Sequence, residues 1–132
     1  MTRYTIDAPT AIRLVREGVT VAAEHQLVAP NVLRSQALSL LYRQTRQGEI
    51  AAADARTLLD GITTMKIRLL GDRVSRQTAW RVAEQFGWDD TVAAEYVAVA
   101  QLQADAFVTL DPELARQVER VVPLAPFEAL LT

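Results

Sequence analysis

The sequence predicts an α/β fold in which a mostly parallel sheet of four to five short strands lies between helices. Short apolar runs that stop at aspartate or proline alternate with longer segments whose apolar residues recur at helical spacing. Such alternation indicates parallel strands, because each helix returns the chain to the same end of the sheet. With 132 residues, half of them hydrophobic, the chain is expected to form one domain over residues 1–132.

Local signals place the individual elements. We expect strands over residues 3–7, 25–30, 106–108 and 120–122, and a short strand or an extended link over residues 66–71. We expect helices over residues 9–17, 31–48, 50–65, 75–86, 91–102 and 112–119, with a helical turn after 126. Gly18, Gly48 and Gly87 are expected to end helices, whereas Asn31 and Ser75 are expected to cap helix starts. The segment 91–102 is apolar on most sides, so it should be central.

Composition excludes several classes of function. The chain has no cysteine and one histidine, His25, which argues against disulfides, thiolate metal sites and a nucleophilic triad. The net charge of −2 provides no overall basic field for nonspecific nucleic-acid binding. No apolar run approaches the roughly 18 residues that a membrane span requires, and no leader pattern opens the chain. We therefore expect a cytoplasmic protein without a membrane partner.

Two of the expected strands end at an aspartate. Asp7 follows the first strand, and Asp111 follows the strand over 106–108 and precedes Pro112. Ligands of open α/β sheets bind outside the carboxyl ends of the strands, and neighbouring parallel strands would bring Asp7 and Asp111 together there. The alternative remains open that each is only a turn or helix-capping residue.

The residues resemble a known family. The strand that ends at Asp7, the Ala-Pro at 29–30 before a helix, the segment 91–100 and the Val-Thr-Leu-Asp of 108–111 look like the PIN domain. The resemblance is strongest to the VapC-like toxins of bacterial toxin–antitoxin pairs, and it runs in order over essentially the whole chain. It implies a three-layer α/β/α fold and cleavage of RNA with Mg²⁺ or Mn²⁺ held by acidic residues.

The resemblance assigns a site by position. The first and last acidic positions of the family fall on Asp7 and Asp111, and Thr109 matches the hydroxyl that accompanies them. The second acidic position falls on Gln36, which keeps the shape without the charge, and the third falls on Ala93, which ligates nothing. We therefore expect Asp7, Asp111, Gln36 and Thr109 to form the catalytic set, with Asp7 and Asp111 as ligands of a weakly bound Mg²⁺ or Mn²⁺.

A carboxylate from a neighbouring position could fill the gap at position 93. Asp89 and Asp90 lie one turn or less upstream, so Asp90 is a further candidate metal ligand, although a solvated loop is the plainer interpretation. Arginines in the middle third of the chain could guide RNA phosphates, or could simply form solvated helix faces. The sequence includes seven of them, at positions 34, 43, 46, 68, 73, 76 and 81.

Two functions of different classes follow. The first is a PIN-type, metal-dependent endoribonuclease, weakened by the changes at Gln36 and Ala93. The second is a catalytically inactive PIN domain that serves as an RNA-binding or protein-interaction module. A receiver-like or nucleotide-binding domain is disfavoured, because the five glycines form no phosphate-binding loop. The resemblance further implies a homodimer and a small antitoxin whose carboxyl-terminal segment, often with an arginine, covers the acidic pocket.

Overall fold

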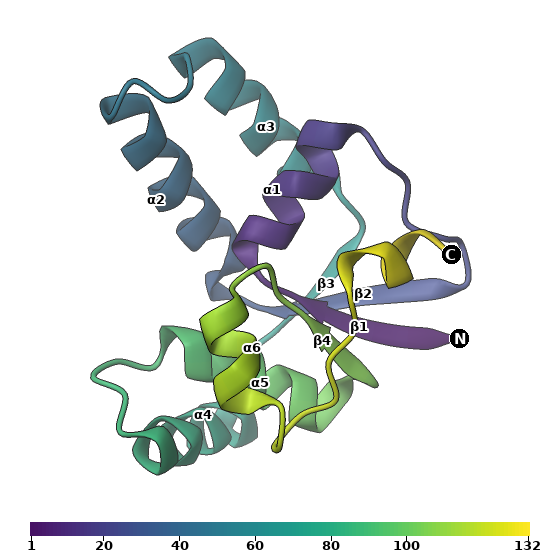
Figure 1. Cartoon of the computed structure of the whole chain (residues 1–132), viewed down its shortest axis with the longest axis vertical. Helices are drawn as coiled ribbons and strands as arrows, with labels where there is room; N and C mark the ends of the chain where they lie inside the picture. The colour runs from purple at the N-terminus through teal and green to yellow at the C-terminus, as the bar shows by residue number, and fades with distance from the viewer.

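Four parallel strands form the central sheet of the protein, in the order β3-β2-β1-β4 (Figure 1). The computed structural model describes residues 1–132. The strands are β1 (Thr2–Ile6), β2 (His25–Pro30), β3 (Ile67–Leu70) and β4 (Ala106–Val108). Tyr4 of β1 pairs with Leu27 on one side and with Ala106 on the other, and β2 also pairs with β3, so β1 and β2 are the interior strands. The expected α/β fold is confirmed, with four strands that are all parallel.

Helices cover both faces of this sheet. They are α1 (Ala8–Glu17), α2 (Val32–Arg46), α3 (Ala52–Thr64), α4 (Arg73–Phe86), α5 (Val92–Gln103) and α6 (Pro112–Val118), with a final 3₁₀ helix η1 (Phe127–Leu131). Helices α1, α2 and α3 pack together on one side of the sheet, and α4 and α5 lie on the other (Figure 1). The protein therefore has the expected three-layer α/β/α architecture.

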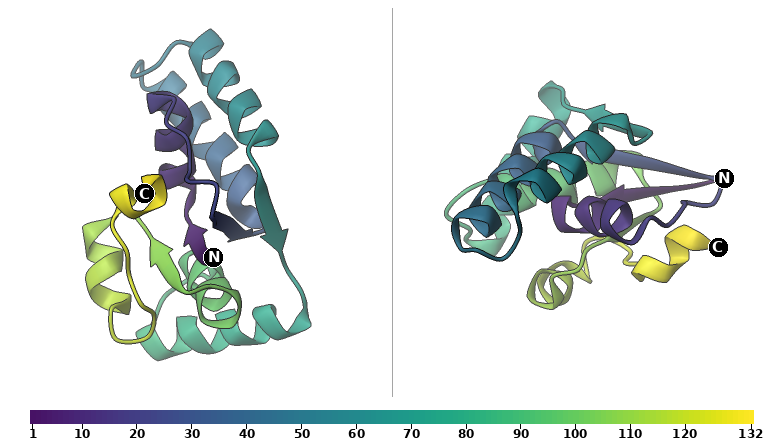
Figure 2. Two further views of the ribbon diagram at one scale, coloured as in Figure 1. Left: turned by 90° about the vertical axis from the view of Figure 1, so that its right-hand side faces the viewer. Right: turned by 90° about the horizontal axis from the view of Figure 1, so that it is seen from above.

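Helix α5 is the central helix that its apolar sequence predicts. It packs on β1, β2 and β4, and α4 packs on its outer side (Figure 2). Five consecutive residues of α5, from Tyr96 to Ala100, are buried, which is possible only for a helix enclosed on several sides. The start of α5, where Ala93 lies, is thereby held close to the carboxyl end of the sheet.

Capping residues fix where the helices begin and end. Gly18 and Gly87 follow α1 and α4 in the left-handed conformation, with φ of 63° and 66°, as their sequence positions predict. The cap of α4 was expected at Ser75, and this prediction is wrong. Asp72 is the cap, and Ser75 completes the capping box from the third helical position. Asn31 takes the capping position of α2, but its side chain makes no capping hydrogen bond.

The strand expected over residues 120–122 is absent. The chain instead turns tightly after α6, where Val121 N and Val122 N both donate to the carbonyl of Val118. It reaches the sheet two residues later, where Leu124 forms a parallel bridge with Phe107. Phe107 N donates to Pro123 O at 2.9 Å, and Ala125 N donates to Phe107 O at 3.0 Å. The carboxyl-terminal segment thus covers the outer side of β4.

No helix in the structure combines the length and the apolar character that crossing a lipid bilayer would demand.

Helices α1 and α3 approach each other closely at Gly61. A Cβ atom at Gly61 would lie 2.5 Å from Cγ1 of Val15. Alanine usually favours a helix over glycine, but this clash should outweigh the gain, so we expect Gly61→Ala to destabilise the protein by about 1–3 kcal/mol. Urea unfolding measures this change. In a Val15→Ala background the same substitution should cost less, whereas an equal cost would show that Val15 is not the obstacle.

Candidate functional site

Asp7 lies at the carboxyl end of β1 and caps α1. Its side chain is only 5 % exposed. Oδ1 accepts hydrogen bonds from Thr10 N at 3.0 Å and from Thr10 Oγ1 at 2.5 Å, and Oδ2 accepts one from Thr109 Oγ1 at 2.5 Å. Both carboxylate oxygens are therefore occupied by donors of the protein itself.

Burial dominates the electrostatics of Asp7. Loss of solvent around the carboxylate raises its pKa above the ordinary 3.8, and the hydrogen bonds from Thr10 and Thr109 oppose this rise without cancelling it. The ionised carboxylate consequently costs stability in the folded protein, and the three donors offset part of that cost.

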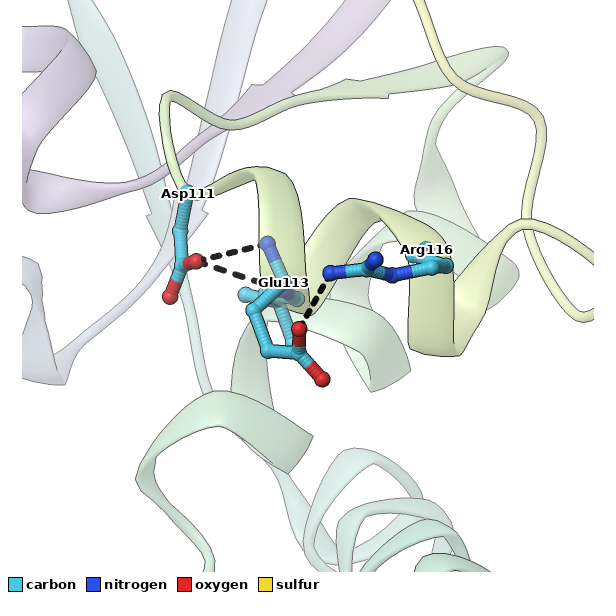
Figure 3. A network of polar contacts seen from close by, with 4 residues as sticks. Asp111, Glu113 and Arg116 are labelled. Carbon is cyan, nitrogen blue, oxygen red and sulfur yellow. Dashed lines mark hydrogen bonds and ion pairs between the residues drawn. The ribbon is translucent and has the colours of Figure 1, made fainter.

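Asp111 caps the start of α6 (Figure 3). Its Oδ1 accepts from Glu113 N at 3.0 Å and from Leu114 N at 3.3 Å, while Oδ2 accepts no hydrogen bond from the protein. Asp111 N donates to Thr109 Oγ1 at 3.1 Å, and that hydroxyl in turn donates to Asp7. The two aspartates thus meet at Thr109, and each is also the capping residue that the plainer interpretation of the sequence allowed.

Gln36 is held by a tyrosine hydroxyl. Tyr96 of α5 donates to Gln36 Oε1 at 2.6 Å, which joins α2 to α5. Burial, together with the charges of Asp7 and Glu95, raises the pKa of Tyr96 far above its usual value, so the hydroxyl stays protonated. Tyr96 and Thr10 were not among the candidates from the sequence. Two signals point to them: the single hydroxyl-bearing residue of an apolar helix, and a threonine three residues after a capping aspartate.

Ala93 lies in a separate, open acidic pocket. The hollow has a volume of about 360 Å³ and is lined by Trp88, Asp89, Asp90, Ala93, Asp111, Glu113, Leu114 and Gln117. No basic residue lines it. Asp90 Oδ1 accepts from Val92 N at 3.1 Å, and Glu113 forms an ion pair with Arg116 (Figure 3). Asp7, Gln36 and Thr109 do not line this pocket, so the candidate residues divide between a buried cluster and an open one.

A larger hollow lies away from these residues. It has a volume of about 910 Å³ and is lined by parts of α1, α3 and the starts of β2 and β3, including His25 and Met65. His25, the single histidine, begins β2 and therefore lies at the amino end of the strands, opposite to the end where Asp7 lies. It supplies no base to the acidic pocket.

The residues present do not fit a complete site for Mg²⁺ or Mn²⁺. No three side chains among histidine, cysteine, aspartate and glutamate gather closely enough to hold a metal ion. Both oxygens of Asp7 and the carbonyl oxygen of Gln36 are taken by protein donors. These hard cations require several oxygen ligands, preferably charged ones, and Asp111 alone offers an uncommitted oxygen beside the buried cluster.

The fold and the site together define a three-layer α/β protein with an acidic pocket outside the carboxyl ends of its strands. No family model and no curated protein matches the chain. Among solved structures, the chain is similar to the crystal structure of PAE2754 from Pyrobaculum aerophilum, at 24 % identity and a TM-score of 0.75. The match covers 98 % of this chain and 93 % of that one, so nearly the whole fold is shared.

The raised pKa of Asp7 predicts how stability depends on pH. Folded Asp7 holds its proton more tightly than unfolded Asp7, so its ionisation should lower stability as pH rises from 3.8 through the raised pKa. We expect Asp7→Asn to remove this part of the pH dependence. The free energy of unfolding of the variant, relative to that of the native protein, should therefore be most favourable at neutral pH. Urea unfolding across this range checks it. If the difference in free energy of unfolding between the native protein and Asp7→Asn does not change with pH, the prediction is contradicted.

Thr109 should contribute to stability through its hydroxyl. Thr109→Val keeps the shape but removes the donor to Asp7 and the acceptor for Asp111 N, so we expect a loss of about 1–3 kcal/mol in the free energy of unfolding. Thr63→Val is the matched control, because the exposed Thr63 hydroxyl donates only within its own helix. Equal stability of the two variants in urea would show that the bridge at Thr109 contributes nothing.

Proposed function

We propose that this chain is a PIN-type domain of the VapC-like kind that works by binding and not by cleavage. It is the second of the two functions that the sequence raises, the catalytically inactive PIN domain. Support comes from the order of the motifs along the chain and from the three-layer fold with an acidic pocket at the carboxyl ends of the strands. Because one fold hosts many functions, the proposal depends on the site.

The observation that carries the proposal is the methyl group at position 93. Ala93 lies inside the acidic pocket, between the loop of Asp89 and Asp90 and the start of α6. A carboxylate here would join the open pocket to the buried cluster, but alanine leaves Asp111 without an acidic partner directed at the same point. The pocket therefore keeps a strong negative charge without the convergent oxygens that a hard divalent cation requires.

Such a pocket is suited to a cationic side chain of a protein partner. Asp89, Asp90 and Asp111 form no ion pair within the chain, so their charges are available. Trp88 lines the same hollow and offers an aromatic surface to a guanidinium. This fits the small antitoxin that the resemblance implies, with an arginine of its carboxyl-terminal segment in the pocket. A homodimer, RNA as a ligand and a cytoplasmic location belong to the same proposal.

A second candidate function is residual Mg²⁺- or Mn²⁺-dependent cleavage of RNA. It is favoured by one observation, the presence of Asp89 and Asp90 in the same hollow as Asp111. A shift of their loop would bring another carboxylate towards the free Oδ2 of Asp111, and RNA phosphates are themselves ligands of these cations. Asp7 and Thr109 would then hold Asp111 in position.

Restoring the missing carboxylate tests the proposal. We expect no Mn²⁺-dependent cleavage of a structured RNA by the native protein, and cleavage at least about tenfold above background by Ala93→Asp, which adds a charged metal ligand. The substitution should be tolerated, because position 93 is in the first turn of α5, where a negative charge is favourable. Cleavage is followed on a labelled RNA in gels.

Two further variants complete the experiment. Ala93→Asn has nearly the same shape as Ala93→Asp without the charge, so it should not cleave. Asp7→Asn keeps the shape and an acceptor for Thr10 but replaces the oxygen that accepts from Thr109 by an amide nitrogen. It reports whether any activity of the native protein requires the charged carboxylate. Cleavage by the native protein that disappears in Asp7→Asn would reject the binding function and establish the second candidate.

A further inference from the structure

One face of α4 combines arginines with an exposed tryptophan. Residues at positions 73, 76, 77, 80 and 81 follow the helical repeat and line a single hollow of about 470 Å³, which we call the basic face of α4: Arg73, Arg76, Gln77, Trp80 and Arg81. The opposite side of the helix is buried, through Ala79, Val82 and Ala83. Packing on α5 fixes the position of α4 (Figure 2), and all five residues of the basic face are exposed.

Trp80 has no structural partner that explains its position. Its side chain is 65 % exposed, although tryptophan is the largest apolar residue of the chain. Trp88, the other tryptophan, stacks on Phe86 with ring centroids 4.9 Å apart. An indole left in solvent between arginines is typical of a binding surface, and its flat face is free to stack on a ligand.

The arginines of this face form no ion pair with a carboxylate of the chain. The hollow is lined by three guanidinium groups and by no carboxylate. Neither of the two ion pairs of the chain involves α4. Asp72, just before the helix, caps it through Ser75, and its pKa is lowered chiefly by those hydrogen bonds and to a smaller extent by the charge of Arg76. Although the chain as a whole carries a net charge of −2, its local field at this face attracts anions.

We infer that the basic face of α4 binds single-stranded RNA, with a base stacked on Trp80 and flanking phosphates held by the arginines. Arginine pairs its planar fork with phosphate oxygens, and an aromatic side chain stacks on a base of any sequence. A hollow of this size lies within the roughly 300–1,000 Å³ of small-ligand sites, enough for one nucleotide at a time. The face should therefore be tolerant of sequence and sensitive to salt.

The choice of RNA over other single-stranded nucleic acids rests on the proposed function. The basic face can bind RNA phosphates, whereas the acidic pocket cannot, because its unneutralised carboxylates repel them. The carboxyl end of α4 leads through Gly87 to Asp89 and Asp90, so the helix that carries the basic face is connected directly to the loop that lines the acidic pocket.

Binding without cleavage tests this site. Fluorescence anisotropy with a labelled 12-nucleotide oligouridine, in the presence of EDTA, compares the native protein with Trp80→Ala and with Arg76→Ala/Arg81→Ala. We expect Trp80→Ala to weaken binding roughly ten- to hundredfold through loss of stacking. The double variant should lower the slope of log affinity against log salt by about 0.7 for each arginine. Tyr42→Ala on α2 and Arg56→Ala on α3, both at exposed positions outside the basic face, are matched controls and should bind as the native protein does.

Each contrary outcome has a distinct meaning. Equal affinity of the native protein and Trp80→Ala, or no binding at all, would overturn the inference while leaving the cleavage experiment unaffected. Tighter binding of double-stranded RNA, or of oligothymidine DNA of the same length, would overturn the assignment to single-stranded RNA. A change of oligomeric state in Trp80→Ala with unchanged affinity for RNA, measured by sedimentation, would assign the face to a second copy of the chain instead.

Discussion

The buried carboxylate of Asp7 is the constraint on which the site depends. Its desolvation must be offset by hydrogen bonds, and the donors come from the first turn of α1 and from the turn after β4. Thr109 links Asp7 to the start of α6, because the hydroxyl that donates to Asp7 also accepts from Asp111 N. One charged group therefore determines where two helices begin and how the ends of two neighbouring strands are arranged.

The parts of the fold that sequence reasoning predicted are those governed by local signals. Apolar runs ending at Asp7 and Asp111 identified β1 and β4, and glycines identified helix ends. The Val-Val of 121–122 suggested a strand, but the chain has to turn there to return along β4, so tertiary context overrode propensity. Pairing of Gln36 with Tyr96, 60 residues apart, and the grouping of Asp89 with Asp111 depend on packing that no local pattern encodes.

The acidic residues of the site lie in two different environments, one buried and one open to solvent. Asp7 is buried and accepts three hydrogen bonds from the protein, whereas Asp89, Asp90 and Asp111 face an open hollow. The basic face of α4 lies beyond the same loop and carries the opposite sign. A chain with almost no net charge thus presents two strong local fields, which would attract partners of opposite charge to separate places on one surface.

The bridge between Phe107 and Leu124 has a consequence for how the protein behaves in a crowded solution. An exposed strand edge is a template on which another chain can add a strand, and such growth leads to aggregates. Because the carboxyl-terminal segment occupies the outer side of β4, only β3 remains as an edge. That edge is four residues long and includes the charged Arg68, so another chain could form only a few backbone hydrogen bonds with it. Residues 123–125 thereby protect this edge of the sheet from uncontrolled extension.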